Sequence, residues 1–157
     1  MKIKIKPHHL LDLICDMGAN NGVFDYISPY GHGMRKYGNL LAQGEIAALS
    51  FTFGADDICS PCIKLKDGVC TDIFNEEIAA RYGMDKKYDY NMILDTGFIK
   101  ALPEIFTPDK ELSIDEVYSL LKEKLTKEII LLNWPRDNRV ELTYKGLEMA
   151  IAVRNNK

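Results

Sequence analysis

Three of the four cysteines in this 157-residue chain fall within Gly54–Asp72, in the sequence GADDICSPCIKLKDGVCTD. Cys59, Cys62 and Cys70 form the spacing C-x2-C-x7-C, and an Asp-Gly pair typical of a tight turn precedes the last of them. A C-x2-C turn directs two sulfurs toward one point, and the later turn brings back the third. This geometry predicts a metal centre, either tetrahedral zinc or an iron–sulfur cluster.

Three thiolates need a further ligand or leave one position open. The candidates are Cys15 and the three histidines of the chain, His8, His9 and His32. Each also has a purely structural interpretation: Cys15 as a small buried apolar residue, and the histidines as core, capping or loop residues. His32 lies between two glycines, where the backbone can approach a ligand closely.

Two carboxylates, Asp56 and Asp57, stand directly before the first cysteine of the loop. They are typical of turn residues that accept hydrogen bonds from nearby backbone donors, and they could also orient a metal-bound histidine. Titratable groups that converge beside a metal indicate acid–base chemistry. We therefore predict His8, His9 and His32 as catalytic residues.

Zinc and iron–sulfur centres both fit the spacing. Zinc accepts four thiolates, or three thiolates and an imidazole, but small zinc modules usually repeat the C-x2-C pair and this chain has only one. Three close cysteines with one distant ligand suit a [4Fe–4S] cluster. Two further interpretations are a thioredoxin-like dithiol, which needs a βαβ unit not indicated around the motif, and a metal-free binding protein with buried thiols.

The N-terminal elements must position these groups. An alternating strand over Lys2–Lys6 precedes Pro7, which suits a first helical turn, and a helix is expected over His8–Met17. A long loop follows over Gly18–Gly33, and its length favours a functional segment. In the predicted helix, His8, Leu11, Asp12 and Cys15 share one face, and polar atoms lie along it at His8, Asp12 and Cys15.

The remaining elements are mainly helical. A helix over Met34–Gln43 precedes a strand over Ile46–Phe53, which we expect to pair with the first strand and to place His8 near Asp56. The pattern predicts later helices over Asn75–Tyr82, Lys86–Asp95, Ile114–Leu125 (with a capping box at Ser113) and around Val140–Ile151, with a connector over Ala101–Leu112. The expected fold is α+β, predominantly helical, with a small two-stranded or few-stranded sheet supporting the cysteine loop.

Length and composition indicate one domain over 1–157, with residues 1–100 as the metal-binding part and 101–157 as a helical cover. A net charge of −3 argues against nucleic-acid or anionic-membrane partners. The basic start is interrupted at Pro7 before any long apolar run, so we expect no signal peptide and a cytoplasmic protein, in which thiols stay reduced. The expected partner is a small-molecule substrate or an electron-transfer protein.

Combined motifs in the first half resemble the DUF1284 family, small bacterial and archaeal proteins of unassigned function. The resemblance covers about residues 5–72 and rests on Pro7-His8-His9-Leu10-Leu11, Asp56-Asp57-Ile58-Cys59-x-x-Cys62 and Gly68-x-Cys70. It implies that Cys59, Cys62 and Cys70 act together, with His8 and His9 in the same site, and it favours an iron–sulfur cluster over zinc.

One position departs from that family. Many of its members carry a cysteine directly after PHHLL, where this chain has Asp12. Cys15 lies three residues later on the same helical face and is our predicted fourth ligand, the alternatives being Asp12, a histidine or an open position. An open iron beside histidines would suit an enzyme, four protein ligands would suit electron transfer, and a closed zinc site would suit an interaction domain.

Overall fold

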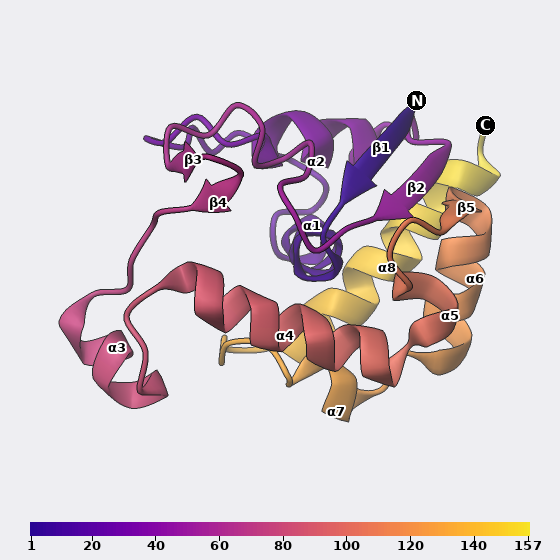
Figure 1. The fold of residues 1–157 in the computed structure, drawn as a ribbon. Helices are drawn as coiled ribbons and strands as arrows, with labels where there is room; N and C mark the ends of the chain where they lie inside the picture. Colours follow the sequence, from indigo (N-terminus) through magenta and orange to yellow (C-terminus); the bar gives the residue numbers. More distant parts are fainter.

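The protein is described by a computed structural model that covers residues 1–157. Its sheet has three strands in the order β1-β2-β5 (Figure 1). β1 (Lys2–Ile5) pairs with β2 (Ala48–Phe51), as expected from the sequence, and the two strands run parallel, whereas β5 (Glu111–Ser113) pairs antiparallel with β2. β5 begins within the expected connector (Ala101–Leu112) and ends at Ser113. The sequence pattern of the connector does not indicate this strand.

The parallel pairing creates a crossover, β1–α1–α2–β2, that the sequence pattern does not predict. α1 (Pro7–Ala19) begins at its proline, and α2 (Met34–Ala42) follows the long loop. The cysteine loop comes after this crossover, and Cys59 and Cys62 lie in turns rather than at a helix start. This placement differs from that of a thioredoxin-like dithiol.

α1 is the central element of the molecule. It is buried on nearly all sides, and α8 (Arg139–Asn155) packs along it. The two helices cross at two glycines, because a Cβ on Gly146 would lie 1.8 Å from the carbonyl oxygen of Ile14 and one on Gly18 would lie 2.0 Å from that of Leu142. Only glycine permits so close an approach of two backbones.

The other helices surround this pair and the sheet. They are α3 (Glu76–Tyr82), α4 (Lys87–Ala101), α5 (Pro103–Phe106), α6 (Ile114–Lys124) and α7 (Lys127–Ile130). The predicted fold class, a predominantly helical α+β protein with a small sheet, is confirmed. The capping box at Ser113 is also present, because its hydroxyl accepts from the backbone of Glu116 and the Glu116 carboxylate accepts in return.

α4 continues beyond its expected end at Asp95. Gly97 does not stop it, and the helix ends only before Pro103. A glycine within a helix costs about 1 kcal/mol, whereas burying a phenylalanine stabilises by roughly 2–3 kcal/mol. Phe98 is fully buried, so its packing outweighs the cost of the glycine.

One hydrophobic core of 26 buried side chains draws on residues both before and after position 100. No helix of the structure combines the length and the apolar character that a membrane crossing requires. A second, two-stranded sheet lies apart from the first, formed by β3 (Leu65–Lys66) and β4 (Val69–Cys70) (Figure 1). The expected tight turn joins these two strands, with Asp67 and Gly68 both at positive φ.

Candidate metal centre

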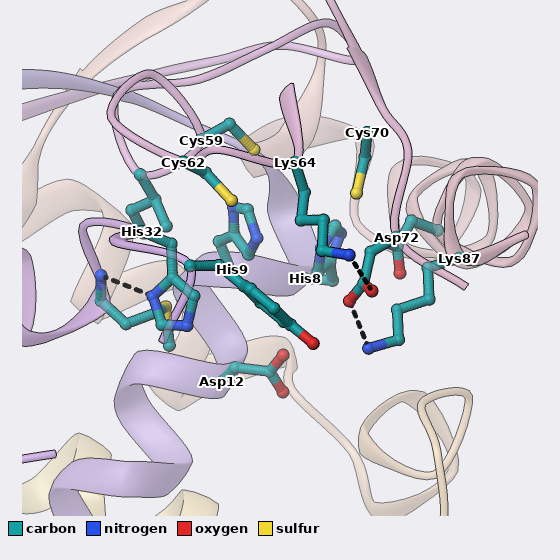
Figure 2. A pocket seen from close by; sticks show the side chains of 14 residues that line it. His8, His9, Asp12, His32, Cys59, Cys62, Lys64, Cys70, Asp72 and Lys87 are labelled. Carbon is teal, nitrogen blue, oxygen red and sulfur yellow. Dashed lines mark hydrogen bonds and ion pairs between the residues drawn. The ribbon is translucent and has the colours of Figure 1, made fainter. Parts of the chain in front are cut away.

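A cavity of about 280 Å³ opens between the cysteine loop, the first turn of α1 and the start of α4. The three cysteines of the loop and all three histidines of the chain line it, namely Cys59, Cys62, Cys70, His8, His9 and His32. Figure 2 shows the sulfur atoms of the loop directed toward the side of the cavity where the rings of His8 and His9 lie. Residues that are far apart in the sequence therefore meet in one place.

The cysteine loop is shaped by its own backbone. The amide of Cys62 donates to the carbonyl of Cys59 at 2.8 Å, and the amide of Leu65 donates to the carbonyl of Cys62 at 3.0 Å. The short hairpin then turns the chain back, and the pairing of Leu65 with Cys70 places the third thiol beside the first two. All three thiols are partly exposed to the cavity and none forms a disulfide.

Asp56 connects the cysteine loop to the N-terminal segment. Its carboxylate accepts hydrogen bonds from the backbone of Lys6 at 2.8 Å, from the backbone of Cys59 at 2.8 Å and from His9 Nδ1 at 2.7 Å. Burial alone would raise the pKa of this carboxyl, but the hydrogen bonds from His9, Lys6 and Cys59 hold the pKa well below its ordinary value. With its oxygens engaged in this way, Asp56 orients both His9 and the cysteine loop.

His9 stands nearest to the first thiol. One ligand atom each from His9, Asp56 and Cys59 lie within 4.8 Å of one another. Burial, then the neighbouring His8, lower the pKa of His9, so its ring is neutral near pH 7. Because Nδ1 donates its hydrogen to Asp56, the Nε2 lone pair is available to the cavity. Metal-binding histidines are commonly held by a carboxylate in this manner.

His8 forms a second pair of the same type. Its Nδ1 lies 2.8 and 2.9 Å from the two carboxylate oxygens of Asp95, and its backbone amide also donates to that carboxylate at 2.8 Å. Both side chains are buried. The rings of His8 and His9 have centroids 4.3 Å apart, so two imidazoles, each held by its own aspartate, lie side by side at the first turn of α1.

His32 reaches the cavity from the long loop. Two backbone hydrogen bonds join this loop to the cysteine loop, from Gly33 to Ile58 at 2.8 Å and from Ile63 to Tyr30 at 2.9 Å. The Nδ1 atom of His32 accepts from the amide of Met34 at 3.4 Å. Burial lowers the pKa of His32, so this ring too is neutral near pH 7.

Cations accompany the thiols. The buried side chain of Lys6 places its Nζ 3.5 Å from the sulfur of Cys59. Lys64 and Lys87 line the same cavity and flank Asp72, at 4.0 and 2.6 Å (Figure 2). The N-terminus of α1, the positive end of its dipole, is also here. This environment favours a bound group of net negative charge, such as a metal with several thiolates.

Even so, Cys59 is protonated near pH 7 without a metal. Burial, then the carboxylate of Asp56, raise the pKa of its thiol to about 11, although Lys6 acts in the opposite direction. A bound cation deprotonates a thiol that coordinates it. Binding at Cys59 would therefore release a proton.

Cys15, the predicted fourth ligand, is not brought to the cavity. It is fully buried where α1 meets the C-terminal segment, and its sulfur lies 3.7 Å from Arg136 Nη1. Seven residues of helix separate it from His8, a rise of about 10 Å, although both share one face. Asp12, one turn from His8, does line the cavity, but its Oδ1 accepts from Arg139 and Asn133, each at 3.0 Å.

Several residues that line or support the site carry little local signal in the sequence, chiefly Lys6, Lys64, Asp72 and Asp95. Helical spacing could have indicated Asp95. Lys87, Asn91 and Asp95 recur at i, i+4 and i+8 and form a polar stripe on α4. Lys87 and Asn91 line the cavity, and Asp95 holds His8.

No family model, curated protein or solved structure matches this chain. The resemblance to the DUF1284 family therefore stays a prediction. What the chain itself provides is a cavity in which a His, Asp and Cys group, with two further thiols, could hold a metal.

Proposed function

We propose that this protein binds a [4Fe–4S] cluster through Cys59, Cys62 and Cys70, and that the cluster acts on a small molecule in the adjoining cavity. The observation that carries the proposal is the single cavity lined by these three thiols and by all three histidines. The resemblance of the sequence motifs to those of the DUF1284 family points the same way.

The size of the cavity supports a group larger than one ion. A water molecule takes up about 30 Å³ of liquid volume, and the cavity has about 280 Å³. A lone zinc ion with thiolate bonds of about 2.3 Å needs its sulfurs within roughly 4 Å of one another. Cys62 and Cys70 stand outside the group of atoms within 4.8 Å, which suits a cluster that spreads its thiolates over several iron atoms.

With three cysteine ligands, a bound cluster would keep one iron without a thiolate, and that iron would supply a Lewis acid. The protein residues would bind and move protons around it. Asp95 fixes Nδ1 of His8 and Asp56 fixes Nδ1 of His9, so each ring presents Nε2 as a base to a molecule in the cavity. Lys6, beside Cys59, offsets the negative charge of the thiolates.

A zinc site is the second candidate, favoured by one observation. His9 and Cys59 already lie within 4.8 Å in a group oriented by Asp56, the arrangement of a zinc-bound histidine and its supporting carboxylate. Cys62 and Cys70 would have to move closer to Cys59 to complete a site of three thiolates and one imidazole. A site closed in this way by four protein ligands serves structure, and the protein would then be an interaction domain.

Anaerobic purification followed by metal and sulfide analysis distinguishes the two. We expect iron and acid-labile sulfide in equal amounts, about four of each per chain, with a broad absorption near roughly 400 nm typical of thiolate-bound iron clusters. Stoichiometric zinc without sulfide would replace this proposal with the zinc candidate. Protein that takes up neither metal would contradict both.

A further inference from the structure

A second cavity, of about 520 Å³, adjoins the metal cavity. The two share four lining residues, His8, Asp12, Lys87 and Asn91. The outer walls of the second cavity come from the segment before α3, from α4 and from the segment that leads into α8. A molecule seated here would lie beside His8 and next to the proposed metal.

One wall of the second cavity is aromatic. Phe74, Tyr90 and Trp134 line it, and the rings of Phe74 and Trp134 are nearly parallel, with centroids 5.7 Å apart and an angle of 28°. Tyr90 meets Phe74 edge-on at 5.5 Å. Two apolar side chains, Ile73 and Ile78, extend this surface. A flat apolar group is the kind of ligand body that such a wall accepts by stacking.

Hydrogen-bond donors also line the second cavity. Arg139 is only 8% exposed, its Nη1 donates to Asp12 Oδ1 at 3.0 Å, and its buried Nε has no acceptor in the protein. Lys87 lines the cavity as well, with its Nζ 2.6 Å from the carboxylate of Asp72, and Asp12 is the one carboxylate on the cavity walls. The Oδ1 atom of Asp12 is already engaged by Arg139 and Asn133. A buried arginine with one unpaired donor, together with a partly exposed lysine, favours a ligand that carries acceptor oxygens.

We propose that the second cavity binds a small organic acid with a flat apolar body. The carboxylate is held by Arg139 and Lys87, and the body stacks on Trp134. Its role as substrate rests on the proposed function, because the second cavity opens to His8 and the metal cavity. The binding itself requires only the residues of the second cavity.

The test uses the intrinsic fluorescence of Trp134, the only tryptophan in the chain. The probes are phenylacetate and 3-phenylpropanoate, each compared with its neutral amide, added to the anaerobically purified full-length protein and to the same protein after removal of metal. We expect at least one acid to change the fluorescence in a saturable way and to bind about tenfold more tightly than its amide, because a charge-assisted contact is lost in the amide.

Two variants locate the carboxylate. Lys87→Gln should weaken binding of the acid about tenfold and leave binding of the amide unchanged. The matched control is Lys86→Gln, at the exposed neighbouring position, which does not line the cavity. It should leave both affinities within about twofold of the wild-type values. Lys87 is partly exposed, so replacing it should disturb the fold less than replacing the buried Arg139 would.

Equal binding of acid and amide would overturn the proposal, as would equal effects of the two lysine variants. No saturable change with either acid up to about 10 mM would overturn it too. Binding by the protein before and after metal removal supports the organic-acid site whatever the metal content proves to be. Failure to find iron would count against the proposed function alone.

Discussion

At the scale of single residues, Asp56 connects the cysteine loop, His9 and the end of the first strand through hydrogen bonds. One buried carboxylate fixes the ring of His9, the amide of the first loop cysteine and the end of the first strand through Lys6. Asp56→Asn would replace one accepting oxygen by a donor that faces other donors. We expect the variant to lose about 2–4 kcal/mol of unfolding free energy at pH 7, measured by urea titration.

The matched control is Asp57→Asn. Asp57 is the next residue, but its carboxylate accepts from the amide of Lys4 at an exposed position, so we expect a loss below about 1 kcal/mol. Equal losses in the two variants would contradict the special role of Asp56.

The stability that Asp56 contributes should also depend on pH. Its pKa in the folded protein lies below the ordinary value of 3.8. The contribution is therefore fully present above the unfolded-state pKa, about 3.9, and is lost as the pH falls through the lower folded-state pKa. The difference in stability between wild type and Asp56→Asn should shrink as the pH falls below about 4.

At the scale of elements, the crossing of α1 and α8 determines where the site can form. α1 carries His8 and His9, and α8 begins at Arg139, which reaches Asp12. Gly146→Ala would place a methyl group 1.8 Å from the carbonyl oxygen of Ile14. We expect this variant to lose about 3 kcal/mol in thermal or urea unfolding, because two helix backbones would have to separate.

Gly97→Ala is the control for this change. Gly97 also lies within a helix, but a Cβ there would meet nothing closer than Leu132 Cδ1, at 3.5 Å. The alanine should stabilise α4 by up to about 1 kcal/mol through its better helix propensity. A Gly146→Ala protein as stable as Gly97→Ala would show that the helices do not need the close crossing.

Local sequence patterns predict much of the fold and part of the site. The helical face of α1, the Asp-Gly turn of the hairpin and the capping box at Ser113 each depend on neighbours within a few residues. The interpretation of Asp56 as a group that orients a histidine and caps backbone donors agrees with its contacts.

Pairings across long sequence separations could not be predicted in the same way. The third strand, β5, is three residues long and its partner is more than sixty residues away, so its own sequence carries little signal. Asp95 meets His8 across 87 residues. Helical spacing correctly places Cys15 on the face of His8, but it does not say that the segment leading into α8 covers that part of the face.

At the scale of the whole molecule, the chain brings the first turn of α1, the cysteine hairpin and the start of α4 together at the C-terminal end of β1, away from both termini (Figure 1). The two adjoining cavities lie at this end, one lined by thiols and histidines and the other by aromatic and cationic side chains. This arrangement suits a metal centre with an organic molecule beside it.

The most direct measurement is the metal content of four cysteine variants purified anaerobically beside the wild type. Cys59→Ser, Cys62→Ser and Cys70→Ser should each lose most of the bound metal, because all three thiols line one cavity. Cys15→Ser should keep the wild-type amount, because that thiol is buried away from the cavity, beside Arg136 in the segment that leads into α8. Full metal content in any of the three loop variants, or its loss in Cys15→Ser alone, would contradict the account.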